Sequence, residues 1–299
     1  MASSTLRALA AYSQERFPLV NMGLFAIVFL TVYAVAHTAV PIGENTFGAG
    51  ETVGILATIS FFFRLRVFDE IKDYATDLEH FPQRVLQSGR VTLGQLRRLA
   101  WAGVVLEAGW SAWLGSPVLA VWALAVAYSL LMRYEFFVPA WLRARLVLYA
   151  FSHLLIMPLV IFWLWTAYAG PRFMPALALL ALLSLLGGLA FEIARKIKAP
   201  EAERPGVDSY SRTLGLRGAI AAALLVLLAG VVAQAMLLRQ LQARSWPLVL
   251  LGGLYLLAAG TYAFCLHRPR ARPLKAAELL VSLELLLSYL SIVLELGLR

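Results

Sequence analysis

The sequence is dominated by mostly apolar runs of about 20 residues, the length a helix needs to cross a bilayer, with polar segments between them. Hydrophobic residues make up 61% of the 299 residues and charged residues 14%, and the mean hydropathy is +0.76. This is too apolar for one soluble core. The sequence therefore predicts an all-α polytopic membrane protein with nine transmembrane helices: Leu19–Val40, Ala49–Phe68, Leu93–Leu114, Pro117–Met132, Leu146–Ala167, Phe173–Arg195, Leu216–Leu238, Trp246–Leu266 and Ala276–Leu296.

The basic residues set the expected orientation. Of the 26 Lys and Arg residues, 22 fall in the N-terminal segment and in every second loop. By the positive-inside rule these segments are cytoplasmic, which places the N-terminus in the cytoplasm and the C-terminus outside, as in a bacterial-type inner membrane. The net charge of +9 then reflects topology and attraction to anionic lipids, and it is not evidence for nucleic-acid binding. The single cysteine, Cys265, excludes a disulfide framework and a cysteine-based metal site.

Residues 1–299 are expected to form one transmembrane domain, because no linker rich in Pro, Gly or Ser separates the apolar runs. Two segments on the cytoplasmic side are long and polar, residues 69–92 and 192–212. They lie four spans apart, which suggests two similar half-sites. We expect them to face one another across a central cavity that is open to the cytoplasm.

Four carboxylates follow directly after an apolar run, at Asp69, Glu70, Asp73 and Asp77. At about 100° per residue, the last three point within roughly 60° of one another on a helix. Ionisable groups at the end of a membrane helix are costly and suggest function, and adjacent carboxylates repel unless a cation lies between them. This stripe predicts a metal site, with Mg²⁺ carrying a phosphate as the expected occupant.

The first polar segment resembles the signature of the UbiA superfamily of intramembrane prenyltransferases, Asn-Asp-x-x-Asp-x-x-x-Asp followed by Pro-x-Arg-Pro and Ser-Gly. Asp73 and Asp77 match that pattern, while Asp69 stands for the Asn and Glu70 for the first Asp. The residues that match the later part of the signature are Pro82, Arg84, Ser88, Gly89 and Thr92, and Val85 replaces the second Pro. The number of spans and their orientation agree with this family as well.

Two further features of the family are only partly kept. Its Tyr-x-x-x-Lys-Arg motif aligns with Tyr128 and Arg133, and Met132 replaces the Lys. Its second acidic motif aligns with a segment that begins at Glu192 and Arg195, where the two Asp positions fall on Ala199 and Glu203. Three cations lie beside these positions, Arg195, Lys196 and Lys198. They suggest direct contacts to phosphate in place of lost metal ligands; the alternative is an ion pair between Glu192 and Lys196 within one helix, with the lysines serving only as a topology signal.

The resemblance implies an enzyme that transfers an isoprenyl group from a prenyl diphosphate to a lipophilic acceptor within the membrane, with Mg²⁺ as cofactor. The implied metal ligands are Asp69, Glu70, Asp73, Asp77, Glu192 and Glu203. The implied diphosphate contacts are Arg66, Lys72, Arg84, Arg195, Lys196 and Lys198. The implied catalytic residues are Asp73, Asp77, Tyr128 and Arg133.

Other activities stay open. The altered second motif leaves room for a terpene cyclase, or for a transferase that joins a lipid phosphate to a glycosyl or phosphoribosyl group. No general base for an acceptor stands out among Asp77, Glu107, Glu135 and His153. A cation transporter is the alternative from another class, suggested by Glu107 and Glu284, which are expected deep in the bilayer. It would leave the polar loop motifs unexplained.

Overall fold

The computed structural model describes residues 2–40, 47–203 and 208–297, and no residue in these ranges forms a strand. The chain forms two compact units. Unit 1 contains Met1–Leu30 and Gly43–Phe137, and unit 2 contains Thr31–Ile42 and Val138–Arg299. The prediction of an all-α fold is confirmed, whereas the single-domain organisation stays a prediction.

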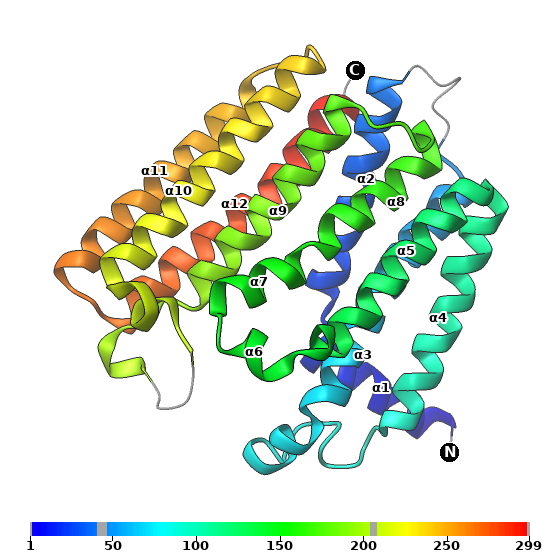
Figure 1. Ribbon diagram of the computed structural model, residues 1–299, viewed down its shortest axis with the longest axis horizontal. Coiled ribbons are helices and arrows are strands. Elements are labelled where there is room, and N and C mark those ends of the chain that lie inside the picture. The colour runs from blue at the N-terminus through cyan, green and yellow to red at the C-terminus, as the bar shows by residue number, and fades with distance from the viewer. Residues whose placement is uncertain (1, 41–46, 204–207, 298–299) are drawn as a thin grey trace. The chain divides into compact units, whose positions relative to one another are not determined.

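Unit 1 is built from α1 (Ala2–Arg16), the first part of α2 (Leu19–Ala39), α3 (Ala49–His80), α4 (Leu93–Leu114), α5 (Ser116–Arg133) and the short helix η1 (Glu135–Phe137). The helices α3, α4 and α5 lie side by side in Figure 1. At 1.5 Å per residue, the 32 residues of α3 reach about 48 Å, well beyond a hydrocarbon core of about 30 Å. If α3 crosses the bilayer as predicted, one of its ends projects beyond the hydrocarbon core.

The segment after α3 is shaped by local signals in the sequence. Gly89 has a positive φ of 76°, which glycine adopts without the steric penalty that a Cβ brings. Thr92 then caps α4 in a capping box with Gln95: the Thr92 hydroxyl accepts a hydrogen bond from the Gln95 backbone N–H, and the Gln95 side chain accepts one from the Thr92 N–H. The Ser-Gly-x-x-Thr segment thus has a structural role: it forms the turn before α4 and caps the start of that helix.

A buried polar network joins α3, α4 and α5. Arg64 of α3 donates to Glu107 of α4 at 3.0 Å and to the hydroxyl of Ser129 of α5 at 2.8 Å. Glu107 accepts two more hydrogen bonds, from Trp122 at 3.0 Å and from Ser60 at 3.1 Å. Arg64 is 3% exposed and Glu107 is fully buried, so each charge depends on these partners for stabilisation.

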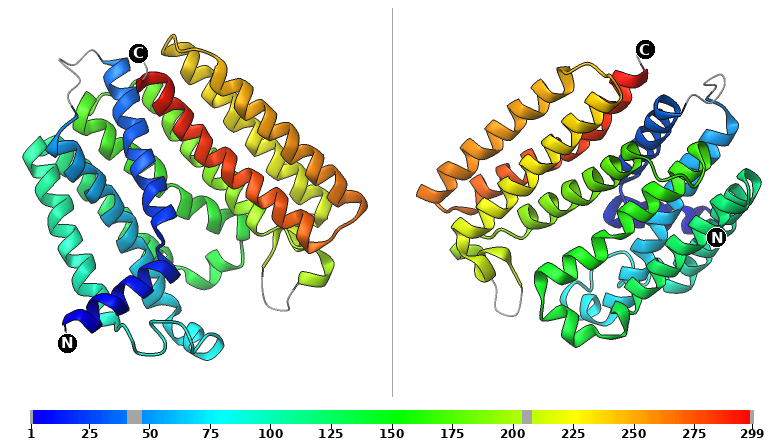
Figure 2. Two further views of the ribbon diagram at one scale, coloured as in Figure 1. Left: turned by 180° about the vertical axis from the view of Figure 1, so that it is seen from behind. Right: turned by 45° about the horizontal axis from the view of Figure 1, so that its top comes forward.

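Unit 2 contains the end of α2, then α6 (Pro139–Arg143), α7 (Leu146–Leu154), α8 (Ile156–Ala169), α9 (Pro175–Arg195), η2 (Pro200–Ala202), α10 (Tyr210–Gln240), α11 (Trp246–His267) and α12 (Ala271–Gly297). Figure 2 shows α9 to α12 packed as a bundle. The fifth predicted span is interrupted between α7 and α8, just before Pro158, which lacks the N–H that would bond to Leu154. Gly215 kinks α10 with a φ of 70°, close to the predicted start of the seventh span.

Seven helices of the described chain are long enough and apolar enough to cross a membrane: Leu19–Ala39, Ser116–Arg133, Leu146–Ala169, Pro175–Arg195, Tyr210–Gln240, Trp246–His267 and Ala271–Gly297. They agree with seven of the nine predicted spans. The other two predicted spans correspond to α3 and α4, which are long enough but contain too many polar and charged residues to be counted with these seven. Nine transmembrane helices therefore stay a prediction. Many large apolar side chains are exposed, among them Leu19, Val105 and Val249, as expected for a surface in contact with lipid.

Candidate functional site

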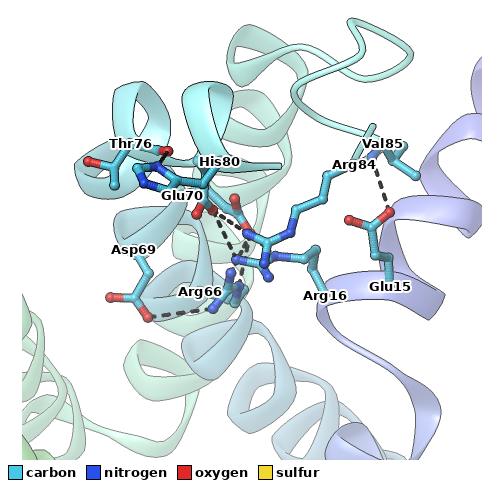
Figure 3. A network of polar contacts seen from close by, with 10 residues as sticks. Glu15, Arg16, Arg66, Asp69, Glu70, Thr76, His80, Arg84 and Val85 are labelled. Carbon is cyan, nitrogen blue, oxygen red and sulfur yellow. Dashed lines mark hydrogen bonds and ion pairs between the residues drawn. The ribbon is translucent and has the colours of Figure 1, made fainter. Parts of the chain in front are cut away.

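The four carboxylates of the acidic stripe occupy the last three turns of α3, in unit 1. Figure 3 shows two of them, Asp69 and Glu70. Their cationic neighbours come from α1, from α3 itself and from the segment after α3. Two of the carboxylates are enclosed by arginines, and the other two are exposed. The stripe predicted from the sequence therefore divides into a structural half and an accessible half.

Glu70 belongs to the structural half. Its side chain is 1% exposed, and its Oε1 accepts from Arg16 Nε of α1 at 2.7 Å and from Arg66 Nη2 at 2.6 Å. Figure 3 shows both guanidinium groups gathered at this carboxylate. Both arginines contact the same carboxylate oxygen, and a role of Glu70 as a metal ligand stays a prediction.

Asp77 is held in the same way. Arg84 Nη1 donates to its Oδ2 at 2.6 Å, and Arg16 Nη2 lies 3.5 Å from the same oxygen. The Arg84 guanidinium also lies 3.8 Å from the centre of the Phe81 ring. The backbone N–H of Val85 donates to Glu15 of α1 at 3.1 Å, which fixes this segment against α1. A substrate phosphate would therefore compete with Asp77 for Arg84.

Asp69 and Asp73, one turn apart, form the accessible half. The side chain of Asp69 is 52% exposed, and the cations that it pairs with are distant, Lys72 at 3.9 Å and Arg66 at 4.0 Å. Asp73 is exposed as well. Partial desolvation of the Asp69 carboxylate, opposed by Lys72 and reinforced by Asp73, raises its pKa to about 6. A cation bound beside Asp69 would favour its ionised form.

The donors present fit a magnesium ion that arrives with a phosphate. In the described residues no group of three or more His, Cys, Asp or Glu side chains is arranged to hold a metal ion. Magnesium is commonly bound through one or two carboxylates together with substrate phosphates and water. Asp69 and Asp73 can supply the two carboxylates.

A strained turn brings a further carboxylate to this site. Glu135, Phe136 and Phe137 in η1 have φ values of 47°, 54° and 61°, a conformation that is costly for residues with a Cβ. Glu135 is buried, and its Oε1 lies 3.6 Å from Lys72 Nζ. Lys72 consequently lies between Asp69 and Glu135. A backbone strained in this way is characteristic of functional sites, where the surrounding structure maintains it.

The two residues of the predicted Tyr-x-x-x-Lys-Arg feature lie beside this turn. The Tyr128 ring packs against Phe136 with 5.5 Å between ring centres. The Arg133 guanidinium lies 5.1 Å from the centre of the Phe68 ring and 5.3 Å from that of Tyr134. Unit 1 thus gathers Arg133 and Lys72 near one end of α3. Their contact with a diphosphate stays a prediction.

The second polar segment lies in unit 2, at the end of α9. Glu192 pairs with Arg195 at 2.5 Å and with Lys196 at 2.7 Å, the ion pair within one helix that the topology interpretation requires. Lys198 Nζ donates to the backbone carbonyl of Arg195 at 2.9 Å. Glu203 accepts a hydrogen bond from the Ser209 hydroxyl at 2.6 Å, and Arg212 Nη2 lies 3.6 Å from Glu203 Oε2. Residues 204–207 of this segment lie outside the described residues, and its predicted position across a cavity from α3 stays a prediction.

The remaining candidates have structural surroundings. Glu107 already accepts from three side chains, which leaves it little capacity as a general base. His153 Nδ1 hydrogen bonds with the Tyr149 carbonyl at 2.9 Å, within α7. Glu284 of α12 is 3% exposed and lines a cavity of about 20 Å³ with residues of α9 and α10, room for about one water molecule.

Sequence reasoning missed the contribution of α1. Arg16 contacts Glu70 and Asp77 across 54 and 61 positions of the chain. From the sequence, an arginine before the first apolar run indicates topology. Nothing in its sequence neighbourhood indicates a contact with α3.

No protein-family model matches the chain, and no curated protein matches it either. Two solved structures are similar. One comes from work on "Structural and mechanistic insights into the biosynthesis of Digeranylgeranylglyceryl phosphate synthase in membranes"; it is 15% identical with a TM-score of 0.70 and covers 98% of this chain and 100% of its own. The other, an apo structure of a UbiA homolog from Aeropyrum pernix K1, is 18% identical with a TM-score of 0.64, over 92% of this chain and 95% of its own. The chain thus has the fold of UbiA homologues, as the motif resemblance predicted.

Proposed function

We propose that this protein is a membrane-embedded, Mg²⁺-dependent prenyltransferase of the UbiA superfamily, which moves an isoprenyl group from a prenyl diphosphate to a lipophilic acceptor. The observation that carries the proposal is the exposed pair Asp69 and Asp73, beside Lys72 at the polar end of α3, in a chain with this fold. Two solvent-accessible carboxylates one turn apart at the polar end of a helix are consistent with a site for a cation and its anionic ligand.

Departure of a diphosphate from an allylic carbon breaks a C–O bond and leaves negative charge on the leaving group. Magnesium, held through Asp69 and Asp73, would supply charge neutralisation there. Lys72 and Arg133 would add direct cationic contacts to the phosphate oxygens. Glu135 would hold the Lys72 ammonium in place, since the two groups are 3.6 Å apart.

In this proposal Glu70 and Asp77 do not contact the substrate and instead position arginines. They hold Arg16, Arg66 and Arg84 and thereby fix the polar end of α3. Arg195, Lys196 and Lys198 of unit 2 are proposed as further phosphate contacts. Glu192 and Glu203 have cation partners of their own, and we propose that they orient these residues rather than bind metal.

The acceptor attacks the carbon that the diphosphate leaves, and it loses a proton once the new bond has formed. A terpene cyclase would need no acceptor at all, and it is the second candidate on the same observation.

The test is turnover of labelled farnesyl and geranylgeranyl diphosphate by the purified protein in lipid nanodiscs, with Mg²⁺ or with EDTA, and with a lipid extract as the source of acceptor. The proposal expects a labelled lipophilic conjugate that forms only with Mg²⁺. A labelled cyclic hydrocarbon would instead support the cyclase. Absence of diphosphate release with every donor and acceptor, by protein that remains folded, would contradict both.

A further inference from the structure

A cavity of about 320 Å³ lies between α3, α4 and α5, within unit 1. Its walls are mainly apolar, with Phe68 and Ile71 of α3, Trp101 and Val104 of α4, and Leu130 of α5. Its volume is in the range of sites that bind small organic molecules. The exposed pair Asp69 and Asp73 does not line it, whereas Arg133, proposed above as a phosphate contact, does.

Three arginines line the same cavity, Arg64, Arg97 and Arg133. The charge of Arg64 is balanced by Glu107, yet its Nε–H is buried and has no hydrogen-bond partner in the described structure. A buried donor in this state costs free energy unless something in the cavity accepts from it. No carboxylate of the described residues forms an ion pair with Arg97 or Arg133, so these two arginines leave net positive charge beside the cavity.

The cavity is accessible from the surface of unit 1. Arg97 is exposed, Trp101 is 69% exposed and Leu130 is 40% exposed. Arg97 lies in the first turns of α4 and Arg133 at the last residue of α5, the ends predicted to face the cytoplasm. At these helix ends the arginines would lie at the level of the lipid headgroups of the cytoplasmic leaflet. The apolar walls would lie at the level of the upper acyl chains.

We propose that this cavity binds an anionic membrane phospholipid, with the headgroup phosphate at Arg97 and one acyl chain along Trp101 and Leu130. Charge complementarity selects the occupant: net positive charge beside the cavity favours an anionic lipid over a zwitterionic one. The apolar walls require a hydrocarbon chain, which free phosphate lacks. This lipid is not a reactant in the function proposed above.

Native mass spectrometry of the detergent-solubilised protein tests the proposal, with phosphatidylglycerol and phosphatidylcholine as matched probes. The wild-type protein should bind phosphatidylglycerol more tightly. The variant Arg97→Gln should lose about fivefold in affinity for it, the contribution of one basic residue near an anionic lipid surface. The matched control is Arg98→Gln, which removes the same charge one residue later, from an exposed side chain outside the cavity.

Equal losses in the Arg97 and Arg98 variants would show general attraction to anionic lipid and overturn the proposal, as would equal binding of the two lipids by the wild-type protein. A second variant, Trp101→Ala, removes part of the apolar wall and should weaken phosphatidylglycerol binding. The lipid assignment is wrong if Trp101→Ala binds phosphatidylglycerol normally and inorganic pyrophosphate alone binds the wild-type protein as well as the lipid does. The site would then recognise only a phosphate group.

Discussion

The buried pair of Arg64 and Glu107 gives a quantitative prediction for the stability of unit 1. Their side chains are 3% and 0% exposed and 3.0 Å apart. In the variant Glu107→Gln the guanidinium loses its counter-ion, and the new amide N–H₂ meets groups that are themselves donors. Breaking such a buried pair costs about 3–5 kcal/mol.

The free energy of unfolding in mixed micelles, measured by titration with a denaturing detergent, tests this value. The control is Glu51→Gln, in the exposed first turn of α3, which should cost about 1 kcal/mol or less. The double variant Arg64→Met with Glu107→Leu should recover most of the loss, because no uncompensated charge remains. Equal stability of Glu107→Gln and the wild-type protein would refute the reasoning.

Two further predictions use the contacts described above. The variant Gly103→Ala would place a Cβ in steric conflict with the Ser60 side chain and should lower the thermal unfolding temperature, whereas Gly109→Ala on the same helix, with nothing within 4 Å, should leave it unchanged or raise it. The variants Lys196→Ala and Lys198→Ala should raise the apparent KM for the diphosphate substrate and weaken inhibition by free pyrophosphate. The Mg²⁺ requirement should be retained. If inhibition by pyrophosphate is unchanged in both variants and in Arg195→Ala, these cations have a topological role only.

The all-α fold was predictable from hydropathy and from the first motif, because both depend on neighbouring residues. The apolar runs that form α9 to α12 and the cap at Thr92 can be predicted from neighbouring residues alone. The count of nine spans rested on hydropathy alone. It treated α3 and α4 like the other helices although both carry charges, and Arg64 and Glu107 satisfy one another only after the two helices pack.

The division of the acidic stripe could not be predicted in the same way. Helix periodicity placed Glu70, Asp73 and Asp77 on one face, but it gave no information about Arg16, which reaches Glu70 only because α1 packs against α3. The three consecutive positive φ values at Glu135–Phe137 were equally hidden, because the sequence there has no glycine to mark a left-handed turn. Contacts distant in sequence and strain imposed by packing are properties of the folded chain.

The central claim is that the exposed carboxylates of α3 hold the magnesium diphosphate, and a Mg²⁺ titration of prenyl transfer by Asp73→Asn tests it most directly. Removal of one ligand of a hard cation should abolish Mg²⁺-dependent turnover. The unfolding temperature should match that of the wild-type protein, because the Asp73 side chain is exposed. Turnover by a folded Asp73→Asn variant at the wild-type rate and with the wild-type Mg²⁺ dependence would contradict the claim.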